Sequence, residues 1–144
     1  MPFKPNENLI PPALSVLRIV SAYLVLQHGT AKYLGFPHMA AFDNLQPMSL
    51  AGIAGLLELV GGALLLIGLF TRPVAFVLSG LLAFAYFLGH APRGNVLFPM
   101  LNGGESAVLF CFAFLFMAVA GGGSWSADAL RAPRRGRGLV GAPR

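Results

Sequence analysis

A single carboxylate, Glu58, stands in the middle of the apolar segment 48–70. A segment of this length can cross a bilayer, which takes about 20 mainly apolar residues. A carboxylate at the centre of a span is costly in free energy unless it is protonated, paired with a cation or turned toward a polar cavity. In such a place it can hold a proton or balance a buried charge. We therefore expect Glu58 to face other protein and not lipid.

The neighbours of Glu58 support this orientation. Ala51, Gly55, Glu58 and Gly62 follow the i, i+4, i+7, i+11 spacing of one helical face. Small residues on a face allow another membrane helix to approach closely. The pattern predicts that a second helix packs around the carboxylate.

Arg18 is a candidate partner of Glu58, which could instead be protonated. Arg18 lies about two turns inside the apolar segment 12–31. At ~1.5 Å of rise per residue its depth differs from that of Glu58 by less than ~10 Å, which a guanidinium side chain can span. The pair would either hold two helices together or form the floor of a polar pocket.

Further polar side chains complete a candidate pocket with Arg18 and Glu58. They lie on the inward faces of the predicted helices or at one common end of them. These residues are His28, Lys32, Tyr86, His90, Asn102 and Glu105. Phe112 and Phe116 share a face with Glu105 and form the candidate apolar wall. We expect a pocket that is acidic at its centre and basic or histidine-lined at its mouth.

Several of these residues also have a simpler interpretation. His28 and Lys32 can extend to the membrane interface, and His90 can stabilise the C-terminal end of its helix. The spacing from Asn102 to Glu105 fits a helix N-cap followed by an acid at the third helical position. These structural roles remain open beside the pocket.

The elements that must position these residues are four apolar helices. The chain has 144 residues, of which 56% are hydrophobic and 10% charged, against about 25% charged in a typical soluble domain. The spans are expected at 12–31, 48–70, 73–90 and 103–120, inside one domain at 12–123. Residues 1–11 precede it, and 124–144 form a basic, flexible tail. The predicted fold is an all-α, integral membrane four-helix bundle.

Charge predicts the orientation and the partners of the tail. An even number of spans places both termini on one side, together with Lys4 and Arg72. Cytoplasmic segments carry the excess of basic residues, so both termini are expected in the cytoplasm. Five of the ten basic residues lie at positions 131–144, where we expect them to bind anionic lipid headgroups. Nucleic acid is not expected, since no recognition fold accompanies the charge.

Conventional catalytic patterns are missing from the sequence. Cys111 is the only cysteine, so one chain can form neither a disulfide nor a two-thiol relay. No helix carries a His and Glu spacing for a metal, so no metal site is expected, and no glycine loop for a nucleotide is present. Haem usually needs facing histidines at similar depth, and His28 and His90 meet this only loosely. No residue can be named as catalytic.

The order of several motifs closely resembles the DoxX family. The resemblance covers about 16–128 and rests on Arg18, His28-Gly29, Lys32, Gly35-Phe36-Pro37, Gly55-Leu56-Leu57-Glu58-Leu59-Val60-Gly61-Gly62, Leu65-Leu66-Ile67-Gly68-Leu69-Phe70-Thr71-Arg72, Ala85, His90, Asn102-Gly103-Gly104-Glu105 and the closing Gly121 to Asp128. It implies a multi-pass, four-helix protein of the bacterial inner membrane with a link to quinone-dependent redox metabolism. Family membership alone does not establish a reaction.

These observations lead to two main functional hypotheses. The first is an accessory or quinone-interacting subunit of a membrane oxidoreductase, in which a partner protein supplies the electrons because no redox cofactor is evident in the sequence. The second is a non-catalytic assembly or lipid-binding module, alone, as a homo-oligomer or with another chain. A small-solute permease is a third option, but four short helices enclose little volume. Whether the protein is an enzyme stays open.

Overall fold

The computed structural model describes residues 6–132, and all the regular structure in that range is helical. Four long helices are present, α1 (Ile10–Tyr33), α2 (Leu50–Ile67), α3 (Thr71–Ala85) and α5 (Glu105–Ala120). The connections contain short helices: η1 (Ala40–Phe42), the π-helical η2 (Tyr86–His90), η3 (Ala91–Arg93), α4 (Pro99–Asn102) and α6 (Ala127–Arg131).

Three of the predicted spans are long and apolar enough to cross a membrane, and they are Ile10–Tyr33, Leu50–Ile67 and Thr71–Arg93. The last one includes η2 and η3, which continue α3 with altered helical winding. The fourth expected span, α5, is apolar but has only 16 residues. Its crossing of the membrane therefore stays a prediction. The tail beyond residue 132 lies outside the described residues.

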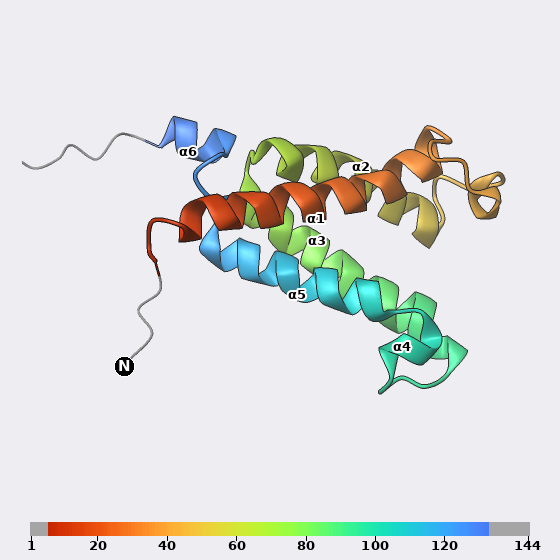
Figure 1. The fold of residues 1–144 in the computed structure, drawn as a ribbon. Coiled ribbons are helices and arrows are strands. Elements are labelled where there is room, and N and C mark those ends of the chain that lie inside the picture. The colour runs from red at the N-terminus through yellow and green to blue at the C-terminus, as the bar shows by residue number, and fades with distance from the viewer. Residues whose placement is uncertain (1–5, 133–144) are drawn as a thin grey trace, which may run out of the picture.

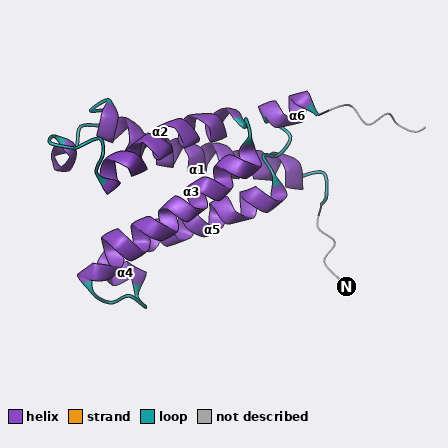
Figure 2. Ribbon diagram, turned by 180° about the vertical axis from the view of Figure 1, so that it is seen from behind, coloured by secondary structure: helices purple, strands orange, loops and turns teal. Residues whose placement is uncertain are grey.

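The helices form two antiparallel pairs, α1 with α2 and α3 with α5. The pairs meet where the α2–α3 turn, the start of α1 and α6 lie together, which we call the joined end (Figure 1). They diverge toward the end that carries η1 and α4, the open end (Figures 1 and 2). The four helices thus do not surround one polar axis at the open end, and the prediction of a closed bundle around such an axis is not confirmed.

Glycines explain why α1 and α2 pack so closely. A side-chain carbon on Gly29 would overlap the backbone of Leu59, and one on Gly62 would overlap the backbone of Leu26. The predicted face of α2 is buried at Gly55, Glu58 and Gly62. Ala51 is exposed, and Gly52 is buried in its place.

The apolar core lies where the two pairs meet. It combines side chains from all four long helices, Ala22, Val25, Leu65, Ala75, Leu78, Leu82, Phe114 and Met117. At its edge the hydroxyl of Ser79 donates a hydrogen bond of 2.8 Å to the backbone oxygen of Cys111. This bond links α3 to α5 without placing an unpaired polar group in the apolar interior.

Candidate functional site

Arg18 is fully buried at the joined end and binds backbone carbonyls. Its Nε donates to the oxygen of Gly122 at 2.9 Å, and its Nη2 donates to that of Trp125 at 2.6 Å. Its Nη1 donates to the oxygens of Leu66 at 2.7 Å and of Leu65. One side chain therefore connects α1, the end of α2 and the segment that follows α5.

The end of α2 is well suited to receive this cation. The last carbonyls of a helix lack partners within the helix and carry a partial negative charge, so Leu65 and Leu66 are natural acceptors. Gly68 ends α2 with a φ of 72°, in the left-handed region. A side chain on Gly68 would also overlap the guanidinium of Arg18 and the side chain of Ser126. Glycine is thus required there by both conformation and space.

Asp128 completes the joined end from α6. Its carboxylate accepts hydrogen bonds from the backbone N–H groups of Phe70, just before α3, at 2.9 Å and of Thr71, the first residue of α3, at 2.7 Å. Its own N–H donates to the oxygen of Gly68 at 3.0 Å. Burial by itself raises the pKa of Asp128, but the hydrogen bonds from Thr71 and Phe70 and the charge of Arg131 outweigh it and hold the pKa below its ordinary value.

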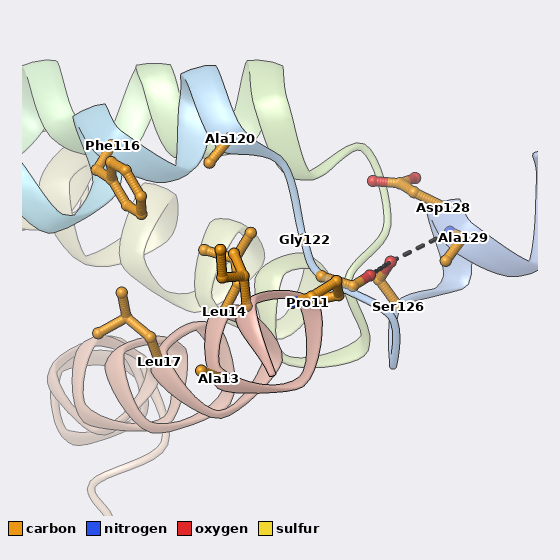
Figure 3. Close-up of a pocket in the computed structure, with 12 residues that line it drawn as sticks. Pro11, Ala13, Leu14, Leu17, Phe116, Ala120, Gly122, Ser126, Asp128 and Ala129 are labelled. Atoms are coloured by element: carbon orange, nitrogen blue, oxygen red, sulfur yellow. Dashed lines mark hydrogen bonds between the residues drawn. The ribbon is translucent and has the colours of Figure 1, made fainter. Parts of the chain in front are cut away.

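We call Arg18, Gly68, Gly122, Trp125 and Asp128 together the latch. The sequence predicts a site role for Arg18, whereas the role of Asp128 appears only in the structure. The available signal was Ser126 two residues earlier, whose side chain caps α6 by accepting from the N–H of Ala129 at 3.1 Å (Figure 3).

Arg18 and Glu58, which the sequence placed within reach of each other, do not pair in the structure. Glu58 Oε2 instead lies 2.6 Å from Nζ of Lys32, and the two side chains are only 9% and 10% exposed. Lys32 starts from the last turn of α1, and its chain passes along α2 in the space left by Gly55. The prediction that Glu58 is paired and faces another helix is thus confirmed with a different cation, because the N–H groups of Arg18 are used by backbone carbonyls.

A second polar cluster joins η2, α4 and the residue just before α5 at the open end. The hydroxyl of Tyr86 donates to the oxygen of Val96 at 2.5 Å and accepts from Nδ2 of Asn102 at 3.3 Å. Oδ1 of Asn102 accepts from the N–H of Gly104 at 2.9 Å, and His90 Nδ1 lies 3.4 Å from the Asn102 backbone oxygen. These bonds shape the chain between α3 and α5.

The remaining candidate pocket residues belong neither to the latch, nor to the Lys32–Glu58 pair, nor to the second polar cluster. His28 and Glu105 are exposed. The predicted capping of α5 by Asn102 is also wrong, since the helix begins after Gly104 without a side-chain cap. Phe112 and Phe116 are 64% and 57% exposed, so they do not line a central pocket. The buried face of α5 carries Ala107, Phe114 and Met117 instead.

The structure therefore divides the predicted pocket. Lys32 and Glu58 belong to the α1–α2 pair, while Tyr86, His90 and Asn102 belong to the α3–α5 pair, and the two pairs diverge at this end (Figures 1 and 2). Arg18 lies at the joined end. Among residues 6–132, no group of three or more His, Cys, Asp or Glu side chains is placed to hold a metal ion.

Two hollows follow the exposed face of α5. The first, which we call the crevice, has a volume of about 640 Å³ and lies between α1 and α5 (Figure 3). Leu14 and Leu17 form one side and Phe116 and Ala120 the other, with Asp128 toward one end. The second hollow measures about 390 Å³ and is lined by Pro99, Met100, Glu105, Val108, Leu109 and Phe112.

Comparison with known proteins matches residues 13–91 to the DoxX family model. The chain belongs to the DoxX family. An uncharacterised protein of Haemophilus influenzae is 46% identical over 126 residues, which cover 85% of this chain and 92% of the relative. The inner membrane protein YphA of Escherichia coli is 30% identical over 130 residues, 82% of this chain and 89% of the relative. No solved structure gives a significant match. Together with the apolar helices, these relatives identify this DoxX chain as a membrane protein.

Replacement of Glu58 by Leu is expected to destabilise the fold by about 3–5 kcal/mol, because it leaves Lys32 buried without a counter-ion. The double variant Lys32→Leu with Glu58→Leu is expected to regain most of that loss. The free energy of unfolding in detergent micelles measures both. Equal stability of the Glu58 variant and the double variant would contradict this account, because removing the unpaired Lys32 would then have relieved no cost.

Acid is expected to weaken the latch through Asp128. Its pKa is lower in the folded chain than its ordinary value of 3.8, so the stabilisation is complete above that value and is lost as the pH falls through the folded-state pKa. The melting temperature should therefore hold from neutral pH to about pH 5 and fall below about pH 4. Asp128→Asn should melt lower at pH 7 and lose less on acidification. Parallel pH profiles of the two proteins would contradict this role.

Proposed function

We propose that this DoxX protein is a multi-pass protein of the bacterial inner membrane that works as a non-catalytic subunit and assembles with a partner chain. The name of the Escherichia coli relative supports the location. The start of α1, the α2–α3 turn with Arg72 and α6 with Arg131 lie together at the joined end (Figure 1). By the positive-inside rule, we propose that the joined end faces the cytoplasm.

One observation carries the proposal: the buried polar side chains of the candidate pocket are already engaged within the protein. Arg18 is occupied by carbonyls, Glu58 by Lys32, and Asn102 by Tyr86 and Gly104. Each set connects helices, and the sets lie in different parts of the fold. Residues paired in this way hold helices together and act as structural supports.

The surface left for a partner is apolar and hollowed. Leu109, Phe112 and Phe116 form an exposed stripe along α5, and each of them lines one of the two hollows. Exposed aromatic side chains beside hollows are typical anchors of protein interfaces. We infer that the partner covers the open-end part of this stripe, around Phe112.

Purification in mild detergent from the native membrane tests the proposal. The tagged protein is expected to bring down a second chain in constant ratio. Phe112→Ala should weaken that association at least about tenfold, because truncation of an aromatic anchor costs about 2 kcal/mol or more.

Phe76→Ala is the matched control, since Phe76 is similarly exposed but lies on α3 and lines neither hollow. It should leave the association unchanged. Recovery of the chain alone under all mild conditions would reject the proposal.

Quinone interaction is the second candidate function. Its support is the 390 Å³ hollow, where the carboxylate of Glu105 and the ring of Phe112 lie beside apolar walls. A quinone head group needs an apolar slot and a proton donor or acceptor near a carbonyl. In this proposal electrons come from a redox partner protein.

A ubiquinone analogue should raise the melting temperature of the wild-type protein in detergent, since a ligand stabilises the state that binds it. Glu105→Gln should reduce that shift by half or more, while Glu58→Gln, at a separate place in the fold, should keep it. An unchanged melting temperature at saturating analogue would dismiss quinone binding.

A further inference from the structure

The crevice between α1 and α5 has the size and lining of a ligand site. Its volume of about 640 Å³ falls within the range of about 300–1,000 Å³ that is usual for bound small molecules. Leu14, Leu17, Phe116 and Ala120 turn toward each other across it (Figure 3). An elongated apolar group would find contacts on both sides.

The end of the crevice at the joined end is polar. Ser126, Asp128 and Ala129 of the α6 region line it there, and so do Gly122 and Gly123. Asp128 is not available to attract a cation from the crevice, because its oxygens already accept from the first N–H groups of α3.

The charge around this end is positive. Arg72 Nε lies within 4 Å of the place where a side-chain carbon on Gly121 would stand, next to the lining Gly122. Arg131 follows the lining Ala129 in α6, and its guanidinium lies 6.0 Å from the Phe70 ring. Both arginines are exposed, and neither forms an ion pair with an acidic side chain among residues 6–132. With buried Arg18, the joined end carries three arginines, while its described carboxylates are those of Asp128 and of Glu7 just before α1.

We propose that the crevice binds one anionic phospholipid, with an acyl chain between α1 and α5 and its phosphate beside Arg72 and Arg131. The apolar side chains of the crevice bind an acyl chain, and the unpaired arginines bind a negatively charged headgroup at the membrane surface. This site is separate from the partner surface around Phe112 and does not depend on the proposed subunit role.

A phospholipid fits better than another transmembrane helix at this place. The crevice closes toward the joined end, where Gly122 and Gly123 pass beside the start of α1: a side-chain carbon on Gly123 would overlap the oxygen of Pro11. A helix is about 10 Å wide with its side chains, whereas a single acyl chain has only the width of an unbranched hydrocarbon chain and is much narrower. The arginines then place the headgroup at the same level as the latch.

Native mass spectrometry of the full chain tests the site after reconstitution into nanodiscs of phosphatidylglycerol and phosphatidylethanolamine in equal amounts. The wild-type protein should retain one phospholipid, with phosphatidylglycerol enriched at least about threefold. Ala120→Phe fills the crevice and should cut the retained lipid at least about tenfold. Val119→Phe is the matched control, because Val119 is its neighbour in sequence, is 73% exposed and does not line the crevice.

Replacement of Arg72 and Arg131 by Gln tests the headgroup. It should abolish the enrichment of phosphatidylglycerol while the acyl contacts still retain some lipid. Three results would overturn the proposal: equal retention in the Ala120 and Val119 variants, enrichment that persists without the two arginines, or a retained molecule that is a quinone or detergent. A melting curve for each variant shows that it is folded.

Discussion

The guanidinium of Arg18 is fully buried in a segment that is otherwise apolar, and a charge in such surroundings is tolerated only when its N–H groups find acceptors. Its acceptors are carbonyls at the end of α2 and in the segment after α5. Because these come from parts of the chain far apart in sequence, satisfying one side chain holds three segments together. Asp128 adds the start of α3 to the same place. The joined end is thus determined by hydrogen bonding as well as by apolar contact.

The need to pair buried polar groups also bears on the arrangement of the helices beyond the joined end. Beyond the latch the two helix pairs share an apolar core and then diverge, and each pair is held by its own polar contacts. Lys32 and Glu58 connect α1 to α2, whereas Tyr86 and Asn102 shape the link between α3 and α5. No described hydrogen bond or ion pair joins these two sets. The pairs can therefore stand apart at the open end and leave the face of α5 uncovered.

This arrangement gives different roles to the two ends of one exposed surface. Near the joined end the face of α5 is opposed by α1 and bordered by arginines, which suits a lipid at the membrane surface. Toward the open end no other long helix covers this face of α5, and Phe112 lies there beside the hollow that contains the carboxylate of Glu105. This part suits a partner chain or a quinone ring. The buried polar groups hold the helices that present this surface.

Features that depend on neighbouring residues alone are predictable from the sequence. Continuous apolar runs predict four membrane helices, and three of these are long and apolar enough in the structure to cross a membrane. The small residues beside Glu58 predict a close helix contact, which Gly55 and Gly62 provide. The resemblance to the DoxX family was also readable from motifs. Helical spacing tells which residues share a face of one helix, but it does not tell which helix covers that face. Only the tertiary structure decided that Glu58 pairs with Lys32, that Arg18 binds carbonyls, and that Phe112 and Phe116 point outward. The physical reason is that a buried charge accepts any partner that satisfies it, and backbone carbonyls, present at every residue, leave no mark in the sequence.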